Sequence, residues 1–317
     1  MGSGETAHIV YGGKPLGSGA RAYWKVRVWD QKGAAPAWSA VARWSAGLLK
    51  AEDWKGKWIG QDEAAAPGGE GRVLPARQLR KEFEAAKRVR RAAVYVAGLG
   101  HYELYLNGAK VGDHVLSPGL TEYDKRVFYV TFDVTRQVLA GRNALGVMLG
   151  NGRYWAPRGK VPVAMRSYGY PKLRLELNLE YADGTTARVS SDESWKLSAE
   201  GPVRANNEFD GEDYDARMEM AGWTRAGFDD ARWEAAGAVA APKGALVAQM
   251  AEPMRVTETL RPVKLAQPRK GVWVFDLGQN MVGWCRLRVA GPKGATVRLR
   301  HAETLQPDGT LYAANLR

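Results

Sequence analysis

The fold is decided by two strand-like runs and a turn, Val94-Tyr95-Val96 followed by Tyr102-Glu103-Leu104-Tyr105-Leu106-Asn107-Gly108. Apolar and polar residues alternate along the second run, as they do where one face of a β-strand is buried. Asn-Gly is a strong signal for the tight turn of a β-hairpin. The stretch therefore predicts antiparallel strands.

The same period of two recurs along the whole chain, and sustained helical periodicity is almost absent. Further strands are predicted over residues 24–29, 127–132, 144–149, 173–179, 272–275, 284–289 and 297–299. Asn or Asp followed by Gly marks turns at 107–108, 151–152, 183–184 and 308–309. Many short strands joined by such turns predict an all-β protein of the sandwich or jelly-roll type.

Two stretches with little to bury divide the chain. Residues 62–71 consist of Ala, Gly, Pro and acidic residues, and residues 235–244 are rich in Ala. We therefore predict three pieces, 1–54, 55–236 and 237–317. The first offers only about three strands, too few to close a sandwich. Its tryptophans are expected to be partly exposed or packed on the next domain: Trp24, Trp29, Trp38 and Trp44.

The formal charge of +12 and the pI near 9.7 raise nucleic acid as a partner. Lys and Arg are scattered along the chain, however, and no zinc-finger, helix-turn-helix or RNA-binding signature is present. No apolar run approaches the roughly 18 residues of a membrane helix. The sequence thus predicts neither a nucleic-acid nor a membrane partner. It leaves a cytoplasmic, periplasmic or secreted location open, although residues 1–8 show no signal-peptide pattern.

An acidic segment, residues 206–215, stands out in this basic protein. It places five carboxylates within eight residues and begins with two Asn. Oxygen ligands of this kind suit calcium, which predicts a calcium set of Asn207, Asp210, Asp213 and Asp215. Carboxylates beside an aromatic ring also suit a sugar, which predicts sugar contacts from Asp210, Glu212, Asp213, Tyr214 and Asp215. The alternative is a solvated acidic turn, or carboxylates paired with Arg204 and Arg217.

A second candidate is the loop Asn151-Gly152-Arg153-Tyr154-Trp155, which follows a predicted strand. We expect it to expose its Arg and aromatic side chains. Asn151, Arg153 and Trp155 are then sugar-binding candidates, because rings stack on a sugar and polar groups donate hydrogen bonds to it. Packing against another domain is the alternative.

Catalytic residues are not predicted anywhere in the chain. A glycosidase needs two carboxyl groups at a set separation, and the acidic segment crowds like charges without an apolar pocket to raise one pKa. No nucleophile elbow or phosphate loop occurs. The single cysteine, Cys285, excludes an internal disulfide. It has no His or Lys nearby in sequence, so we predict a buried, unreactive thiol. No cofactor is required, with calcium as the one candidate.

The chain resembles bacterial α-L-rhamnosidases, of the glycoside hydrolase family 78 type, in three regions. The first contains residues 21–30, Trp38-Ser39, Gly47-Leu48-Leu49, Trp54 and Trp58-Ile59-Gly60. The second runs from Leu79-Arg80-Lys81-Glu82-Phe83 through residues 95–108 to Gly211-Glu212-Asp213-Tyr214-Asp215-Ala216-Arg217. The third contains Phe275-Asp276-Leu277-Gly278-Gln279-Asn280, Leu299-Arg300-His301-Ala302-Glu303 and Asn315-Leu316-Arg317. The matching residues cover nearly the whole chain, in order.

This resemblance implies partial fibronectin-III-like strands, a jelly-roll sandwich and a second β-sandwich that is clipped at its C-terminal end. The family removes terminal α-L-rhamnose from glycosides with inversion, and its catalytic carboxylates lie in a helical (α/α)6 barrel. No helical pattern of that kind occurs here. We therefore expect a non-catalytic accessory portion whose partners are L-rhamnose-containing glycosides and the barrel of the same polypeptide. The alternatives are a free-standing rhamnose-binding protein and a structural module with no ligand.

Overall fold

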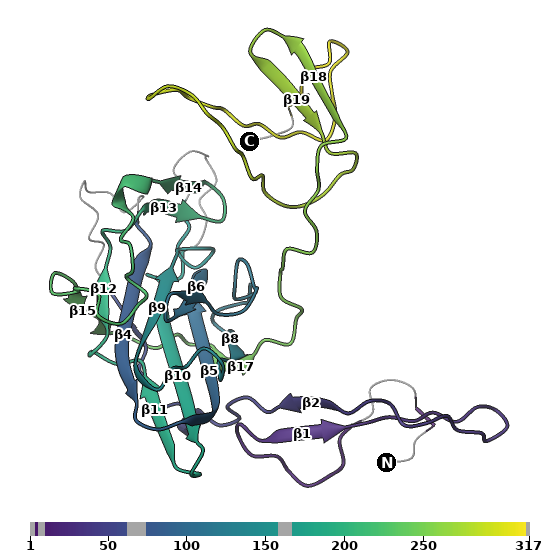
Figure 1. Cartoon of the computed structure of the whole chain (residues 1–317), viewed down its shortest axis with the longest axis vertical. Coiled ribbons are helices and arrows are strands. Elements are labelled where there is room, and N and C mark those ends of the chain that lie inside the picture. The colour runs from purple at the N-terminus through teal and green to yellow at the C-terminus, as the bar shows by residue number, and fades with distance from the viewer. Residues whose placement is uncertain (1–3, 6–9, 62–73, 158–166, 315–317) are drawn as a thin grey trace. The chain divides into compact units, whose positions relative to one another are not determined.

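The computed structural model describes residues 4–5, 10–61, 74–157 and 167–314, and its regular structure is almost entirely β (Figure 1). The predicted all-β fold is confirmed. The chain forms two compact units, Met1–Met254 and Arg255–Arg317. Within the described ranges no helix is long and apolar enough to cross a membrane.

Two antiparallel sheets form a sandwich in the first unit. The seven-stranded sheet contains β3 (Ile59–Gly60), β5 (Val89–Leu99), β8 (Arg126–Asp133), β10 (Lys172–Tyr181), β11 (Thr186–Ser190), β16 (Gly237–Ala238) and β17 (Ala245–Ala248). The six-stranded sheet contains β4 (Arg77–Ala85), β6 (Tyr102–Leu106), β7 (Ala109–Lys110), β9 (Gly141–Leu149), β12 (Lys196–Ser198) and β15 (Glu234–Ala235). Only β17 runs parallel to its neighbour, β8, among the strands described in these sheets.

The main core lies between these two sheets. Val94 and Val96 of β5 contribute to it, together with Leu104 and Leu106 of β6. Tyr95, between the two valines, faces a second cluster on the outer side of the seven-stranded sheet, where it packs with Trp54 and Tyr129. The alternation in the opening stretch is therefore confirmed, and β5 is buried on both faces. Asn107 and Gly108 have φ of 54° and 85°, as the tight hairpin turn requires.

The N-terminal strands β1 (Arg21–Trp24) and β2 (Ala42–Ser45) pair with each other and precede the short 3-10 helix η1 (Ala51–Asp53). Trp24, Trp29, Trp38 and Trp44 are 46–54% exposed, which confirms the expected partial exposure. Cations cover some of this aromatic surface. The Arg27 guanidinium lies 4.9 Å from the Trp29 ring centre and 4.7 Å from that of Trp38.

The sandwich unit continues past the division predicted at residue 236. Gly237 pairs with Gly60, and Ala245 pairs with Arg126, so β16 and β17 extend the seven-stranded sheet. The boundary between the two compact units lies after Met254 instead. An Ala-rich composition indicates few large side chains to bury, but short edge strands need only backbone hydrogen bonds.

In the second unit, β18 (Lys264–Arg269) and β19 (Val272–Asp276) form a hairpin. The strands predicted over 284–289 and 297–299 are wrong, because these described residues have no ladder partner and their side chains are exposed. The prediction for Cys285 is also wrong. Its thiol is exposed, and the sulfur lies 3.4 Å from Nε2 of His301, a residue distant in sequence.

Candidate functional site

The two candidate segments lie together at one end of the sandwich. The acidic segment forms a hairpin of β13 (Val203–Asn207) and β14 (Gly211–Tyr214), followed by the 3-10 helix η2 (Ala216–Met218). The amide of Glu208 donates to the carbonyl of Gly152 at 3.2 Å. The Arg153 guanidinium lies 5.5 Å from the Phe209 ring centre. These two contacts come from the turn of the hairpin, and further contacts come from Asn206 of β13.

Asn151 fastens the loop to the hairpin. It is fully buried, and its side-chain amide donates to the carbonyls of Leu74 at 2.6 Å and Asn206 at 2.9 Å. Its backbone amide donates to Oδ1 of Asn206 at 2.6 Å. The loop also packs tightly against Gly100, where φ is +119° and an added Cβ would overlap the carbonyl oxygen of Gly150. These contacts give Asn151 a structural role.

The aromatic residues of the loop are buried, so the expectation that the loop exposes them is wrong. Trp155 is 7% exposed and stacks on Tyr170 with ring centres 6.5 Å apart. Tyr154 is 4% exposed and packs against Tyr123 and Tyr168. The sequence does not reveal this burial, because Tyr123, Tyr168 and Tyr170 come from other segments. The assignment of Asn151, Arg153 and Trp155 as sugar-binding residues stays a prediction.

The predicted ligands on the hairpin are largely engaged with their neighbours. Oδ1 of Asn207 accepts from the amides of Phe209 and Asp210, both at 2.8 Å. Asp215 forms a two-pronged pair with Arg217, with distances of 2.8 and 2.6 Å. The hydrogen bonds from Arg217 lower the pKa of Asp215 to about 2. Pairing with Arg217 was one of the two alternatives left open by the sequence.

Glu212 and Tyr214 of β14 have different surroundings. Glu212 lies at the surface, and the partial removal of its carboxyl from water, followed by the nearby Glu103, raises its pKa. Glu103 itself accepts hydrogen bonds of 2.5 Å from Tyr105 and from Lys110. The Tyr214 hydroxyl donates to Glu219 at 2.6 Å, which raises its pKa to about 12, and its side chain is half exposed.

The calcium set does not assemble around a centre. No three Asp, Glu, His or Cys side chains within the described ranges come together as metal ligands. Asp215 is held by Arg217, and the amide of Asn207 donates to Asp210 at 3.3 Å. These residues as arranged do not fit the ion, and calcium stays a prediction from which we derive no chemistry.

The pKa of Glu212 gives a prediction for stability. A raised pKa means that the native state binds the proton of Glu212 more tightly than the unfolded chain does. Protonated Glu212 therefore adds to the free energy of unfolding at low pH, and this addition is lost as pH rises through the raised pKa. We expect Glu212→Gln to stabilise the protein by ~0.3 kcal/mol at pH 7 and to have no such advantage at pH 4. Urea midpoints at both pH values measure this. Glu252→Gln, at an exposed site, is the matched control. If Glu212→Gln were less stable than the unaltered protein at pH 7, the ionised carboxylate of Glu212 would not be destabilising.

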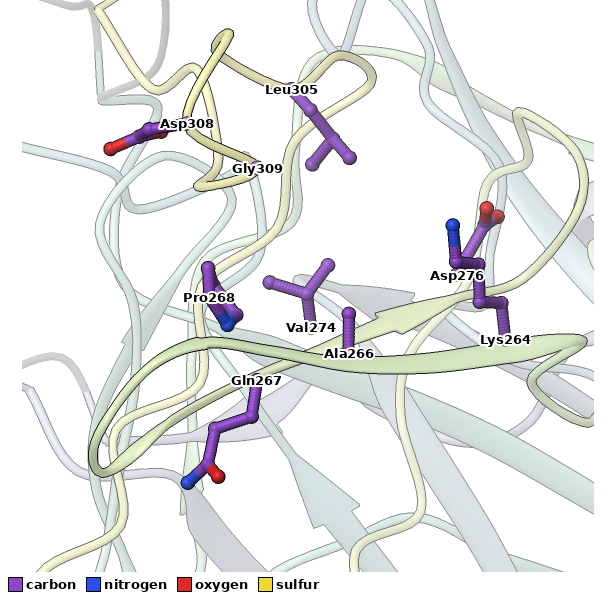
Figure 2. A pocket seen from close by; sticks show the side chains of 9 residues that line it. All are labelled: Lys264, Ala266, Gln267, Pro268, Val274, Asp276, Leu305, Asp308 and Gly309. Carbon is purple, nitrogen blue, oxygen red and sulfur yellow. The ribbon is translucent and has the colours of Figure 1, made fainter.

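Two cavities of about 270 Å³ are present in the described structure. The first lies in the second unit, between the β18–β19 hairpin and the turn around Asp308, and Figure 2 shows Ala266, Val274 and Leu305 pointing into it. Hydrogen bonds from Thr310 lower the pKa of Asp308. The walls of this cavity are mainly apolar. The carboxylate at its border, Asp308, accepts hydrogen bonds from Thr310 within its own turn.

The second cavity lies on the six-stranded sheet and is lined by Arg80, Lys81, Glu82, Ser194, Lys196, Phe228 and Asp230. Sequence reasoning did not single out these residues as a site. One signal was available, since three successive charged residues interrupt the strand between Leu79 and Phe83. The partners on residues 194–230 are distant in sequence and gave no corresponding signal.

Comparison with known families gives matches along the chain. Residues 87–258, more than half of it, match the family described as Alpha-L-rhamnosidase N-terminal domain. Residues 266–317 match the Bacterial alpha-L-rhamnosidase concanavalin-like domain. Residues 1–50 match the Rha78A-like, N-terminal immunoglobulin domain, whereas the sequence led us to expect fibronectin-III-like strands there.

Individual relatives agree with these matches. An α-L-rhamnosidase of Streptomyces avermitilis is 48% identical over 269 residues, which are 82% of this chain and 26% of the relative. One from Formosa agariphila is 36% identical over 330 residues, with coverages of 97% and 34%. The crystal structure of the Streptomyces avermitilis α-L-rhamnosidase complexed with L-rhamnose matches with a TM-score of 0.84 at 31% identity, covering 97% of this chain and 46% of that chain. The chain thus spans about a quarter to a third of the curated relatives.

Proposed function

Because this chain belongs to the α-L-rhamnosidase N-terminal domain family, we propose that it is a non-catalytic accessory β-domain portion of an α-L-rhamnosidase. The enzyme as a whole would remove terminal α-L-rhamnose from glycosides. The observation that carries this proposal is the family match over residues 87–258, which contain most of the two-sheet sandwich. The relatives also extend well beyond the region they share with this chain.

The chemistry of the two cavities supports an accessory role. A glycosidase needs a carboxylic acid that is protonated at the working pH, opposite a second carboxylate. Burial opposes ionisation of Glu82, but hydrogen bonds from Arg80, Arg142 and the Gly227 amide lower its pKa. The pKa of Asp308, at the other cavity, is lowered as well. Both groups are therefore poor general acids.

The purified 1–317 protein is expected to release no aglycone from an aryl α-L-rhamnoside. Hydrolysis requires an acid, a base and a pocket that holds water and the sugar ring together, and we assign these to the barrel of the longer enzyme. Release of the chromogenic aglycone measures it, with the chain joined to the barrel of its parent gene as the positive control. Turnover by the 1–317 protein, abolished by one carboxylate substitution within it, would overturn the proposal.

For the acidic hairpin we propose weak binding of L-rhamnose. The half-exposed ring of Tyr214 and the nearby carboxylates of Glu212 and Glu219 support this. Titration calorimetry should then detect binding of L-rhamnose at millimolar concentration. Asp213→Ala should abolish binding without unfolding the protein, while Asp192→Ala, elsewhere on the sandwich, should leave it unchanged. No heat of binding at millimolar rhamnose would leave the solvated acidic turn as the correct interpretation.

A further inference from the structure

Cys285 and His301 bring a sulfur and a nitrogen ligand together at the surface of the second unit. The Sγ atom of Cys285 lies 3.4 Å from Nε2 of His301, although the two residues are 16 positions apart in sequence. Both side chains are exposed, so dissolved ions can reach them. The pair is therefore open to a ligand, and it belongs to a different unit from the acidic hairpin.

The distance between these two atoms matches the geometry of a tetrahedral metal ion. Zn²⁺ lies about 2.3 Å from a thiolate sulfur and about 2.0–2.1 Å from a histidine nitrogen. At a tetrahedral angle, two such bonds place the sulfur and the nitrogen about 3.5–3.6 Å apart, which is within about 0.2 Å of the separation in this structure. A linear arrangement of the same bonds would need about 4.3–4.4 Å. The pair therefore suits tetrahedral rather than linear coordination.

The chemistry of the two side chains selects the same class of ion. A thiolate and an imidazole are the ligands that Zn²⁺ takes in proteins, whereas calcium takes oxygen atoms. The thiol must lose its proton to bind, and Nε2 of the imidazole presents its lone pair when the ring carries its proton on Nδ1. Among the residues that the structure describes, no third Asp, Glu, His or Cys joins the two as a ligand.

The pair also connects two segments that lack regular pairing. Residues 284–289 and 297–301 form no strand, and Figure 1 shows no arrow beyond β19. An ion held by both side chains would close the loop between the segments and reduce its conformational freedom. Because the ion binds the closed arrangement and not the open one, it would stabilise this part of the second unit.

We propose that Cys285 and His301 bind a divalent transition-metal ion of the Zn²⁺ type, with water in the remaining coordination positions. The ion fixes residues 284–289 to residues 297–301. Two protein ligands bind more weakly than the four of a structural zinc site, so we expect a dissociation constant on the order of 10 µM. The site goes beyond the accessory role proposed above, which needs no metal.

Co²⁺ is the probe for this site, because a bond between Co²⁺ and a thiolate gives a charge-transfer absorption band in the near ultraviolet. Cys285 is the only thiol in the chain, so the band reports on this one position. Titration of the full 1–317 chain, kept reduced and without a polyhistidine tag, should give one Co²⁺ per chain. Zn²⁺ should then remove the band, because it binds more tightly and displaces Co²⁺. No band at millimolar Co²⁺ would overturn the proposal.

Three variants locate the ion. Cys285→Ser should abolish the band, and His301→Gln should weaken Co²⁺ binding at least tenfold with an unchanged circular dichroism spectrum. The control is His114→Gln, which removes an imidazole from the first unit and should leave the affinity unchanged. Equal affinity in His301→Gln and the unaltered protein would show that the thiol binds alone, and the paired site would be wrong.

Tryptic cleavage measures the closing of the loop independently of the absorption band. Arg286, Arg288, Arg298 and Arg300 are exposed cleavage positions within the two segments. Zn²⁺ at ten times its dissociation constant should slow cleavage at these positions about tenfold, because cleavage requires the open arrangement. Cys285→Ser should be cleaved at the same rate with and without Zn²⁺. If Zn²⁺ did not slow cleavage of the unaltered protein, the ion would not be fixing the two segments together.

Discussion

Arg80→Ala is expected to destabilise the sandwich unit by about 3–5 kcal/mol. The guanidinium donates to the carbonyls of Trp223 and Arg225, both at 2.9 Å, and pairs with Glu82 and Asp230. Its removal leaves two carboxylates without their shared cation. It also releases residues 223–230 from the outer face of the sheet. Urea denaturation at neutral pH measures the loss.

Arg142→Ala is the matched control for Arg80. Arg142 pairs with Glu82 at 2.9 Å, but its side chain is 70% exposed. Surface ion pairs contribute little, so we expect a loss under about 1 kcal/mol. If Arg80→Ala were as mild as Arg142→Ala, the buried guanidinium would not be what holds residues 223–230 in place.

Trp195→Ala is expected to cost about 3–5 kcal/mol, since the whole indole is removed from a packed core. Trp195 is fully buried in the main core, and its ring nitrogen donates to the carbonyl of Ser190 at 3.0 Å. Trp195→Phe should cost less, because it keeps most of the apolar volume and loses the hydrogen bond. Thermal and urea unfolding measure both.

Trp29→Ala provides the comparison at an exposed tryptophan. Trp29 is 54% exposed, and the Arg27 guanidinium lies 4.9 Å from its ring centre. We expect a loss of about 1 kcal/mol or less. A larger loss than that of Trp195→Ala would mean that the N-terminal strands, rather than the sandwich, limit the stability of the unit.

Local pattern was sufficient to predict several of the longer strands of the sandwich. The alternation at 94–96 and 102–106 and the Asn107-Gly108 turn depend only on neighbours in sequence, and each lies in a strand or turn of the structure. Residues 284–289 alternate equally well, yet they form no strand, because a strand also needs a partner that alternation does not supply.

The candidate site was less predictable, because its properties come from distant segments. The burial of Trp155 depends on Tyr170, and the pairing of Glu82 depends on Arg80 and Arg142. The pair of Asp215 and Arg217 was one of the alternatives that the sequence left open, since the two residues are close in sequence. The cavity on the six-stranded sheet was not foreseen, since its walls come from segments that are distant in sequence.

The pairing of β16 and β17 has a consequence for the order in which the protein folds during synthesis. β3 lies near the start of the sandwich, yet it pairs with β16, and β8 acquires its outer neighbour only from β17. A nascent chain therefore carries open strand edges until residue 248 has left the ribosome. Contacts of such long sequence separation form slowly, and unpaired edges invite association between chains. Premature termination before residue 237 should thus yield an aggregating product, whereas termination after Met254 completes the sheet.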